Sequence, residues 1–193
     1  TVVHDSIQDL GRAATLYEQL LDQDSSKLEA FEALVGILNQ TGDVHTLEAA
    51  YQRMIQRLQD ESGETKDKKA LFMLYRNLGE LYHQELKDRP KAIQAFEAAL
   101  EQHSNHEATR EKVARLCVRT PECLERAQFH YRMLISHYPE NFTGYHSLSA
   151  IWAGQGNLDG SWRIAGLLTL FGNAMDAEKR LYQKHLSPKP IDT

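Results

Sequence analysis

The sequence predicts an all-α protein, a superhelix of stacked antiparallel helical hairpins. Three observations favour this fold class. Only 11 Gly and 5 Pro interrupt the 193 residues, which is too little turn chemistry for a sandwich or barrel of short strands. Apolar residues recur at helical spacing along most of the chain, and this pattern repeats with a basic period of 34 residues. The composition, 41% hydrophobic and 25% charged, suits a soluble chain with a core.

The repeat is clearest in a stripe of residues that we assign to the second helix of each hairpin. In five segments, one residue is followed four positions later by another and three positions further on by a third, which places all three on one helix face. The first position recurs after 34, 45, 35 and 34 residues, so one interval contains an insertion. The five trios are Ala13, Tyr17 and Leu20; Leu47, Tyr51 and Met54; Ala92, Phe96 and Ala99; Ala127, Tyr131 and Leu134; and Ser161, Ala165 and Leu168.

A second stripe lies upstream of the trio in four of the segments. Its members are three, four and seven positions from the first, so they form the packed face of a first helix that faces the second helix of the same unit. Each unit is therefore expected to be a helical hairpin. The four sets are Phe31, Leu34, Val35 and Leu38; Tyr75, Leu78, Gly79 and Tyr82; Glu111, Ala114, Arg115 and Val118; and Tyr145, Leu148, Ser149 and Trp152.

The residues between the predicted helices are those that end and begin helices. Gly after a helix can adopt positive φ, and a following Asp or Asn can cap the next helix. Pro near the first position of a helix loses no hydrogen bond. The glycine turns are Gly42-Asp43 and Gly156-Asn157, Pro90 and Pro121 are expected to open second helices, and Ser104 and Pro139 are expected to close them.

These elements predict a single repeat domain over residues 1–193. Its opening helix, roughly Ser6 to Gln23, has the stripe of a second helix, and the first half of that unit is expected to be absent or to lie in a longer parent. The expected parts are the second half of a unit at 6–25, units at 28–61, 72–105, 108–141 and 142–173, and a capping helix and tail at 174–193.

The insertion is expected to form a loop, and the C-terminal end of the chain a capping helix with a tail. The insertion, Ser62 to Leu71, overlaps a polar run from Asp60 to Asp67 and is expected to form an exposed loop with longer flanking helices. A tolerated surface insertion is favoured over a partner-specific protrusion. The final helix, Asp176 to Leu186, is expected to cap the array, and Ser187-Pro188-Lys189-Pro190 to end helical structure as a loose tail. The packed side of this cap is expected to carry Ala177, Leu181, Tyr182 and His185.

The combined pattern resembles the tetratricopeptide repeat (TPR) family, whose unit carries an aromatic, a Leu-Gly pair and a Tyr on its first helix, and an Ala, an aromatic and an Ala on its second. The resemblance covers about residues 6 to 173 and implies a right-handed solenoid of four to five TPR-like units with a C-terminal capping helix. The fourth unit departs most, with Glu111 and Arg115 at positions of an aromatic and a Gly. The best match is Tyr75, Leu78, Gly79, Tyr82, Ala92, Phe96 and Ala99.

The resemblance also implies a binding surface, because the first helices of this family line a concave groove. Side chains beside the packing stripe are expected to hold an extended peptide or a partner helix by hydrogen bonds and charge pairing. For each residue alone, a merely solvated helix face is the alternative. The expected groove residues are Glu29, Glu32, Asn39, Arg76, Asn77, Glu80, His83, Thr109, Lys112, Arg119 and His146.

The charges of this surface narrow the expected ligand. The two-carboxylate clamp of chaperone-binding TPR proteins is matched only at Asn77, so binding of a chaperone tail is not expected. Arg76, Lys112 and Arg119 instead predict a ligand with an acidic segment facing the third and fourth units.

Residue patterns for catalysis, metals and cofactors are not found, so we expect no enzyme activity, no metal and no cofactor. The glycine-rich run from Gly154 to Gly160 has no strand before it and is expected to be an inter-helix turn. The histidine pairs, His103 with His106 and His130 with His137, lack the further converging ligands that a metal needs.

Charge and cysteine content restrict the function classes further. The net charge is −5, with −6 in residues 1–97 and +1 in 98–193, so the basic footprint of a nucleic-acid protein is missing and no nucleic-acid partner is expected. The apolar run of roughly 20 residues that a membrane helix needs is missing too, so direct membrane insertion is not expected. Cys117 is expected to pack in a helix and Cys123 to lie in a turn, with a local disulfide as the alternative.

The sequence thus predicts a non-catalytic scaffold or adaptor that binds a protein or peptide in its groove. The alternatives are a docking or regulatory portion of a larger multidomain protein, which could itself be an enzyme, and, less favoured, a helical-repeat protein that binds RNA. Self-association through the end hairpins also stays open. The pattern assigns no compartment, although the cytoplasm is slightly favoured.

Overall fold

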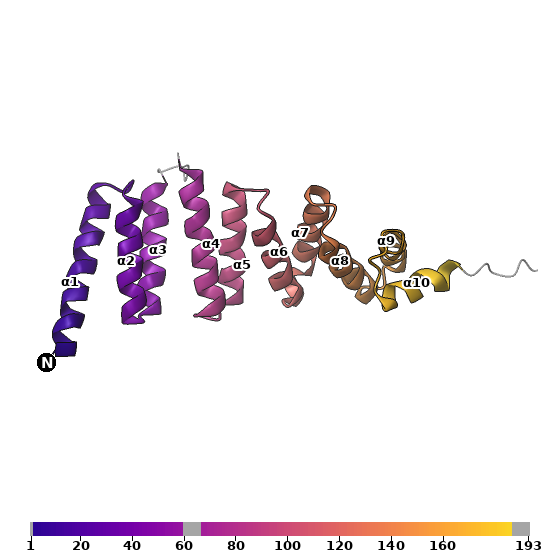
Figure 1. Cartoon of the computed structure of the whole chain (residues 1–193), viewed down its shortest axis with the longest axis horizontal. Helices are drawn as coiled ribbons and strands as arrows, with labels where there is room; N and C mark the ends of the chain where they lie inside the picture. Colours follow the sequence, from indigo (N-terminus) through magenta and orange to yellow (C-terminus); the bar gives the residue numbers. More distant parts are fainter. Residues whose placement is uncertain (1, 60–66, 187–193) are drawn as a thin grey trace, which may run out of the picture. The chain divides into compact units, whose positions relative to one another are not determined.

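The computed structural model describes residues 2–59 and 67–186, and the side chains of 9–59 and 67–184. Within these ranges the chain is helical with no strand, which confirms the all-α fold class. The chain forms two compact units, residues 1–104 (unit 1) and 105–193 (unit 2), coloured indigo to magenta and orange to yellow in Figure 1. The single domain expected from the repeat stays a prediction. None of the helices in the described part has the length and apolar character needed to cross a membrane.

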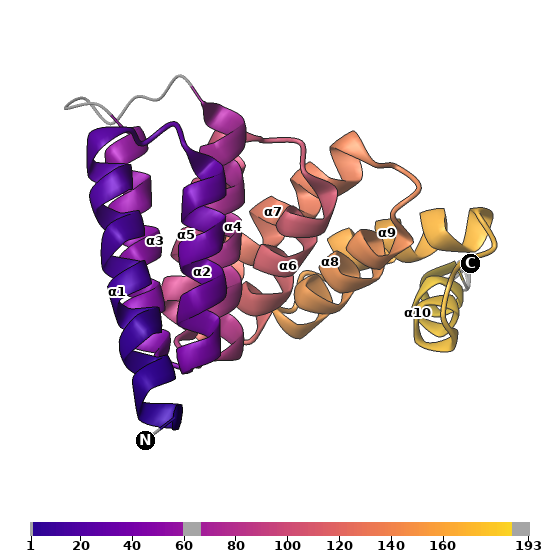
Figure 2. The same ribbon diagram turned by 60° about the vertical axis from the view of Figure 1, so that its left-hand side comes forward.

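Unit 1 contains a lone helix followed by two hairpins. The lone helix α1 (Val2–Gln23) lies along the first hairpin at the edge of the unit (Figures 1 and 2). It begins before the predicted start near Ser6, because no Gly or Pro interrupts residues 2–5. The hairpins are α2 (Leu28–Thr41) with α3 (Val44–Leu58), and α4 (Lys68–Gln84) with α5 (Arg89–Gln102).

Unit 2 contains two hairpins and a final helix. Pro121 opens a short 3-10 turn, Pro121–Cys123, and not the second helix itself as predicted; the helix starts immediately after this turn. Proline's fixed φ suits the first position of such a turn as well as that of an α-helix. The helices are α6 (Glu107–Val118), α7 (Leu124–His137), α8 (Phe142–Gly154), α9 (Leu158–Leu170) and α10 (Asp176–Leu186), the last with the predicted bounds.

The core of each unit is built on the second-helix stripe. In the four complete hairpins every predicted member of this stripe is at most 7% exposed, and Phe96, Met54 and Leu134 are fully buried. Burying one large apolar side chain contributes about 1.5–3 kcal/mol, so this stripe is the main source of cohesion within a hairpin. The stripes predicted from the four-then-three spacing are therefore confirmed in α3, α5, α7 and α9.

The first-helix stripe is confirmed in three hairpins and shifted in the fourth. In α6 the predicted Val118 is 40% exposed and Arg115 is exposed, whereas Val113 and Cys117 are fully buried together with the predicted Ala114. The helix is rotated so that its apolar residues are buried, and the Arg115 guanidinium stays exposed, 3.8 Å from the carboxylate of Glu111 on the same predicted face. The prediction that Cys117 packs in a helix is confirmed, and both cysteines are free thiols.

Caps and turns follow the sequence closely. Gly42 and Gly156 have φ of 69° and 76°, the left-handed conformation in which a side chain would be strained. At the N-terminus of α3 the Asp43 carboxylate accepts the backbone N–H of Thr46. Equivalent caps are Asp67 on α4, Asp88 on α5, Asn141 on α8 and Asn157 on α9.

The predicted insertion ends inside a helix. Lys68–Leu71 forms the first turn of α4, and Ala70 and Leu71 are buried there, so this part of the insertion belongs to the longer flanking helix that was expected beside the loop. The Asp67 cap satisfies the first turn and lets the helix start early. The predicted loop at Asp60–Lys66 and the predicted tail at Ser187–Pro190 lie outside the described residues.

The capping helix uses a different face from the predicted one. Glu178 is 8% exposed and Ala177 is exposed, so the packed side is centred on Glu178 and Tyr182. The Glu178 carboxylate accepts the backbone N–H of Met175 at the start of α10 and lies 2.8 Å from Nδ1 of His146 on α8. These two partners explain why a carboxylate is buried here. The side chain of His185 lies outside the described residues.

A substitution at Gly79 tests the closest first-to-second helix contact. A Cβ at this position would lie 2.7 Å from two ring carbons of Phe96, so Gly79→Ala should lower the free energy of unfolding by about 1–3 kcal/mol despite better helix propensity. The matched control is Gly36→Ala in α2, where the added Cβ meets nothing within 4 Å and should stabilise by about 0.5–1 kcal/mol. Urea unfolding measures both, and stabilisation by both changes would contradict this packing.

Candidate functional site

Unit 1 contains a pocket between its two first helices, α2 and α4. Its volume is about 400 Å³, and its back wall is formed by Tyr51 of α3. Because α2 and α4 belong to successive hairpins, the pocket exists only when the two hairpins pack together. The lining residues are Leu28, Phe31, Glu32, Val35, Tyr51, Asp67, Lys69, Ala70, Met73, Leu74 and Asn77.

The floor of the pocket is apolar and rigid. Phe31 and Tyr51 are buried and meet edge to face with ring centroids 5.3 Å apart, an arrangement that fixes both rings. Leu74 is buried beside them, whereas Met73 is 41% exposed at the mouth. An apolar group entering the pocket would therefore meet a preformed floor and one adaptable methionine.

The rim is polar and carries both signs of charge. Glu32 and Asp67 supply carboxylates, and Lys69 supplies an ammonium group. Asp67 also accepts the backbone N–H of Ala70 at 2.8 Å, so its position is set by the helix start. An apolar floor with a few polar groups at its rim is typical of a site that takes one large side chain and orients the chain around it.

Asn77 is held at the pocket by Tyr51. The two side chains share a hydrogen bond, which ties α4 to α3. Burial raises the pKa of the Tyr51 hydroxyl above its ordinary value, and the hydrogen bond from Asn77 offsets only part of this rise. The hydroxyl therefore stays neutral at physiological pH and acts as a hydrogen-bonding group, not as a charge.

The predicted groove residues are brought together only in part. Glu32 and Asn77 line the pocket. On the same helices Glu29 and Asn39 are exposed, and Arg76, Glu80 and His83 are partly exposed. Nε of Arg76 is buried with no hydrogen-bond partner among the described residues. In unit 2, Lys112 is partly exposed and Arg119 is exposed.

Two predicted groove residues of unit 2 serve the fold instead of an open surface. Thr109 is 3% exposed, and its backbone N–H and hydroxyl face Nδ1 of His106, which caps α6. This corrects the expectation that Thr109 faces an open groove, because residues in the first turn of a helix commonly engage the cap. His146 is partly exposed, but its ring faces the Glu178 carboxylate of α10.

Lys69 and Met73 belong to the pocket and were missed from the sequence. They precede Asn77 by eight and four positions, so the three lie on one face of α4. The four-residue spacing of Lys69, Met73 and Asn77 is the sequence signal that could have identified the first two as site residues. The interpretation of residues 62–71 as an insertion hid it, because that interpretation placed Lys69 in a loop.

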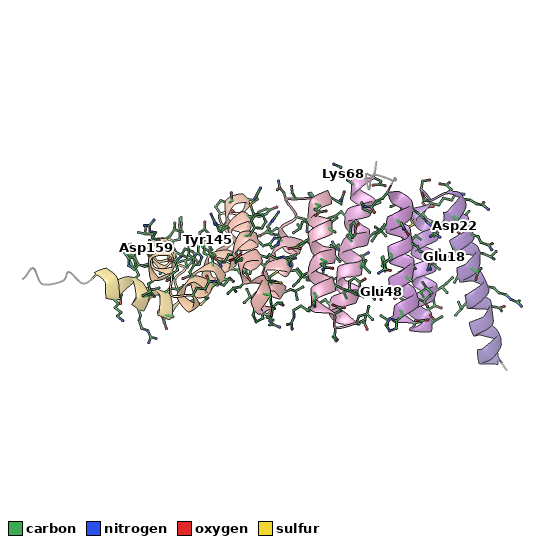
Figure 3. The ribbon with its side chains drawn as sticks, turned by 180° about the vertical axis from the view of Figure 1, so that it is seen from behind. Glu18, Asp22, Glu48, Lys68, Tyr145 and Asp159 are labelled. Carbon is green, nitrogen blue, oxygen red and sulfur yellow. The ribbon has the colours of Figure 1, made fainter. Side chains whose placement is uncertain are left out.

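A polar cluster behind the pocket fixes the position of α4. Glu48 of α3 accepts the hydroxyl of Tyr82 at 2.8 Å and Nζ of Lys91 of α5 at 3.2 Å; Figure 3 labels Glu48. Burial and the hydrogen bond to Glu48 raise the pKa of Tyr82 to about 12. Burial alone would raise the pKa of Glu48, but the bonds from Tyr82 and Lys91 outweigh it and hold this pKa below its ordinary value.

Other hollows and clusters are less suited to binding. A larger hollow of about 750 Å³ is lined only by residues 83–90, so it is the outer surface of one turn. Lys87 in that turn has φ of 54°, and the neighbouring Asp88 N–H is bonded to the carbonyl of Tyr82. Over the described part of the chain, no group of three or more His, Cys, Asp or Glu is arranged to hold a metal ion.

The chain is similar to solved structures of helical-repeat proteins. YrrB, a TPR protein with an unusual peptide-binding site, is 15% identical with a TM-score of 0.53, covering 95% of this chain and 88% of that chain. A tetratricopeptide repeat protein from Parabacteroides merdae is 17% identical with a TM-score of 0.52, covering 92% and 68%. A chain in the structure of Naa15/Naa10 bound to HypK-THB is 17% identical with a TM-score of 0.61, covering 98% of this chain but 24% of that one.

These likenesses confirm that the chain has the TPR fold that the sequence resembled. Sequence identities this low establish the fold alone. No protein-family model matches the sequence, and no curated protein matches it.

The Glu48 cluster predicts how stability depends on pH. Because the folded-state pKa of Glu48 is lowered, its contribution is complete above the unfolded-state pKa and is lost as the pH falls through the folded-state pKa. Glu48→Gln should therefore reduce the loss of unfolding free energy between about pH 6 and about pH 3, as measured by urea unfolding. The control Glu29→Gln, at an exposed position of α2, should keep the wild-type dependence, and identical curves for all three proteins would contradict the prediction.

Proposed function

We propose that this TPR-fold chain is a non-catalytic interaction scaffold that binds a peptide or a partner helix at the α2–α4 pocket. The observation that carries the proposal is the pocket itself, with a buried aromatic floor and a charged rim on adjacent first helices. Its volume of about 400 Å³ lies within the range of ligand pockets, roughly 300–1,000 Å³.

The shape and chemistry of the pocket favour one large apolar side chain as the anchor of the bound segment. Phe31, Tyr51 and Leu74 offer an apolar surface that is already ordered, so these three side chains lose little conformational freedom when the anchor binds. Met73 can adjust its position to different anchors, which suits recognition of Leu, Met or Phe.

The rim charges favour a basic residue beside that anchor. Glu32 is exposed at the rim, and the fixed carboxylate of Asp67 adds a second negative charge, against one ammonium group from Lys69. A Lys or Arg next to the anchor would face this acidic side. Asn77, already oriented by Tyr51, offers a hydrogen bond to the backbone of the segment.

An acidic stretch of the ligand was expected from Arg76, Lys112 and Arg119, and for the pocket of unit 1 we retain Arg76. This residue is next to Asn77 in the sequence, and its Nε has no hydrogen-bond partner among the described residues. The acidic stretch would follow the apolar anchor on the side of Arg76. Lys112 and Arg119 belong to unit 2 and stay a separate prediction of an acidic ligand for that unit.

Two likenesses support this function and its alternative. YrrB is a TPR protein with a peptide-binding site, which supports a peptide as the ligand of this fold. The similar chain in the Naa15/Naa10 structure is several times longer than this one, which supports the second candidate, a docking portion of a larger protein. Both candidates use the same pocket.

Replacing Met73 tests the pocket. Peptides selected from a random 12-residue library on the full chain should include some whose binding, measured by fluorescence anisotropy, falls at least about tenfold with Met73→Asp, since the charge would face the apolar floor. The matched control is Leu170→Asp, which changes another exposed apolar residue, 83% exposed in α9, and should leave binding unchanged. If every selected peptide binds the Met73→Asp protein normally, the pocket is not the site.

Charge reversal tests the orientation of the ligand. Glu32→Lys should weaken the binding of peptides with a basic residue beside the anchor, whereas Arg76→Glu should weaken the binding of peptides with an acidic stretch, each by several-fold at low salt. Added salt should reduce these differences. If both variants bind these peptides with unchanged affinity, the charge assignment is wrong, and the apolar anchor is then judged by Met73→Asp alone.

A further inference from the structure

Helix α1 carries the stripe of a second helix, and no first helix pairs with it among the described residues. Its residues Ala13, Tyr17 and Leu20 are of the same types, at the same spacing, as Ala127, Tyr131 and Leu134 of α7. In α7 these residues are 0%, 2% and 0% exposed. In α1 all three are only half-buried, although the stripe is chemically the same.

The difference is sharpest at Leu16, between the first two members of the trio. Leu16 is 66% exposed, an unusual state for a leucine flanked by apolar neighbours on the same helix face. In three of the four complete hairpins the equivalent position, three residues after the start of the trio, is closed: Ala50 is 0% exposed, Ala95 6% and His130 5%. In the fourth hairpin it is Ile164, which is half-buried.

In the hairpin of α7, the stripe is covered by α6. That first helix contributes small and medium apolar side chains, with Val113, Ala114 and Cys117 fully buried. Because α1 carries the same stripe, a helix with apolar residues of this size at the same spacing would fit against it. The shape of the missing neighbour is thus given by a hairpin of the same molecule.

The other side of α1 is already fixed. Leu21 is fully buried, and α1 packs along α2. Glu18 pairs with Arg53 and Arg57 of α3 at 2.6 Å each, and Asp22 also pairs with Arg57; Figure 3 labels both acidic residues. The ion pairs hold α1 in the position of a second helix, so its open face is preorganised and continuous with its packed face.

We infer that this open stripe, Ala13, Leu16, Tyr17 and Leu20, binds an amphipathic helix supplied from outside the 193 residues and thereby completes the first hairpin. The bound helix runs antiparallel to α1 and presents small apolar residues at three- and four-residue spacing, as α6 does to α7. No residue of α1 lines the α2–α4 pocket, so this surface is separate from the proposed peptide site.

A peptide copied from the chain itself provides the probe. A fluorescein-labelled peptide of residues 105–120, which contains α6, carries Cys117→Ala to prevent oxidation and is titrated into the full-length protein. We expect saturable binding by anisotropy and a loss of at least about tenfold in affinity with Leu16→Glu. A peptide of the same composition in scrambled order should not bind.

Matched variants separate binding from folding. Leu16→Glu changes an exposed side chain, so its helix content and urea midpoint should equal those of the wild type. Leu16→Ala should weaken binding less than Leu16→Glu, because it removes contact area without adding a charge. Leu170→Glu, a change at an exposed leucine of unit 2, should leave the affinity unchanged.

Other results of these experiments would contradict the binding of a helix to α1. Absence of saturable binding up to about 1 mM peptide, or binding that ignores Leu16→Glu, would overturn the inference. Sedimentation of the protein at several concentrations tests a second copy as the occupant. Self-association that Leu16→Glu abolishes and the peptide cannot compete away would assign the stripe to another copy of this chain and also overturn the inference.

Discussion

The rest of the structure depends on one contact, the burial of the second-helix stripe against the first helix of the same hairpin. Where a hairpin is complete, this stripe is closed to solvent, as at Phe96 and Leu134. The ring of Phe96 lies so close to Gly79 that only a residue without a side chain fits between the helices. Once the two helices are locked in this way, the outward faces of the first helices are set, and with them the pocket between α2 and α4.

Within each unit, polar contacts then link neighbouring elements. In unit 1, Glu18 reaches from α1 to α3, and Glu48 joins α3 to both helices of the next hairpin. In unit 2, the buried carboxylate of Glu178 joins α10 to His146 of α8. Buried or half-buried charges of this kind are tolerated because each has several partners, and they fix the relative position of helices that apolar packing alone would leave free to slide.

The sequence was sufficient for the features that depend on local periodicity. The four-then-three spacing identified the stripes of α3, α5, α7 and α9, and Gly42, Gly156 and the Asp or Asn caps identified the turns. These features could be predicted because helix faces and helix ends are decided by residues within a few positions of one another. The bounds of α10 were correct for the same reason.

The features that were predicted incorrectly depend on contacts between residues far apart in the sequence. Helix α6 buries Val113 and Cys117 and leaves Arg115 exposed beside Glu111, and Glu178 is the buried residue of α10 because His146 of α8 lies beside its carboxylate. Of the candidate site, Glu32 and Asn77 were predicted; Lys69 was hidden by the inserted segment, and Met73 was missed although it lies inside a predicted unit. The pocket arises from the packing of two hairpins, which periodicity within one helix does not describe.

The distance along the chain between polar partners has a consequence for folding. Tyr82 and Glu48 are 34 positions apart, Arg53 and Glu18 are 35 apart, Asn141 and Glu107 are 34 apart, and His146 and Glu178 are 32 apart. Each contact therefore closes a loop about one unit long, and its entropic cost is nearly the same everywhere in the array. A chain of such low contact order folds rapidly, and its nucleus can form at any hairpin and spread to the next.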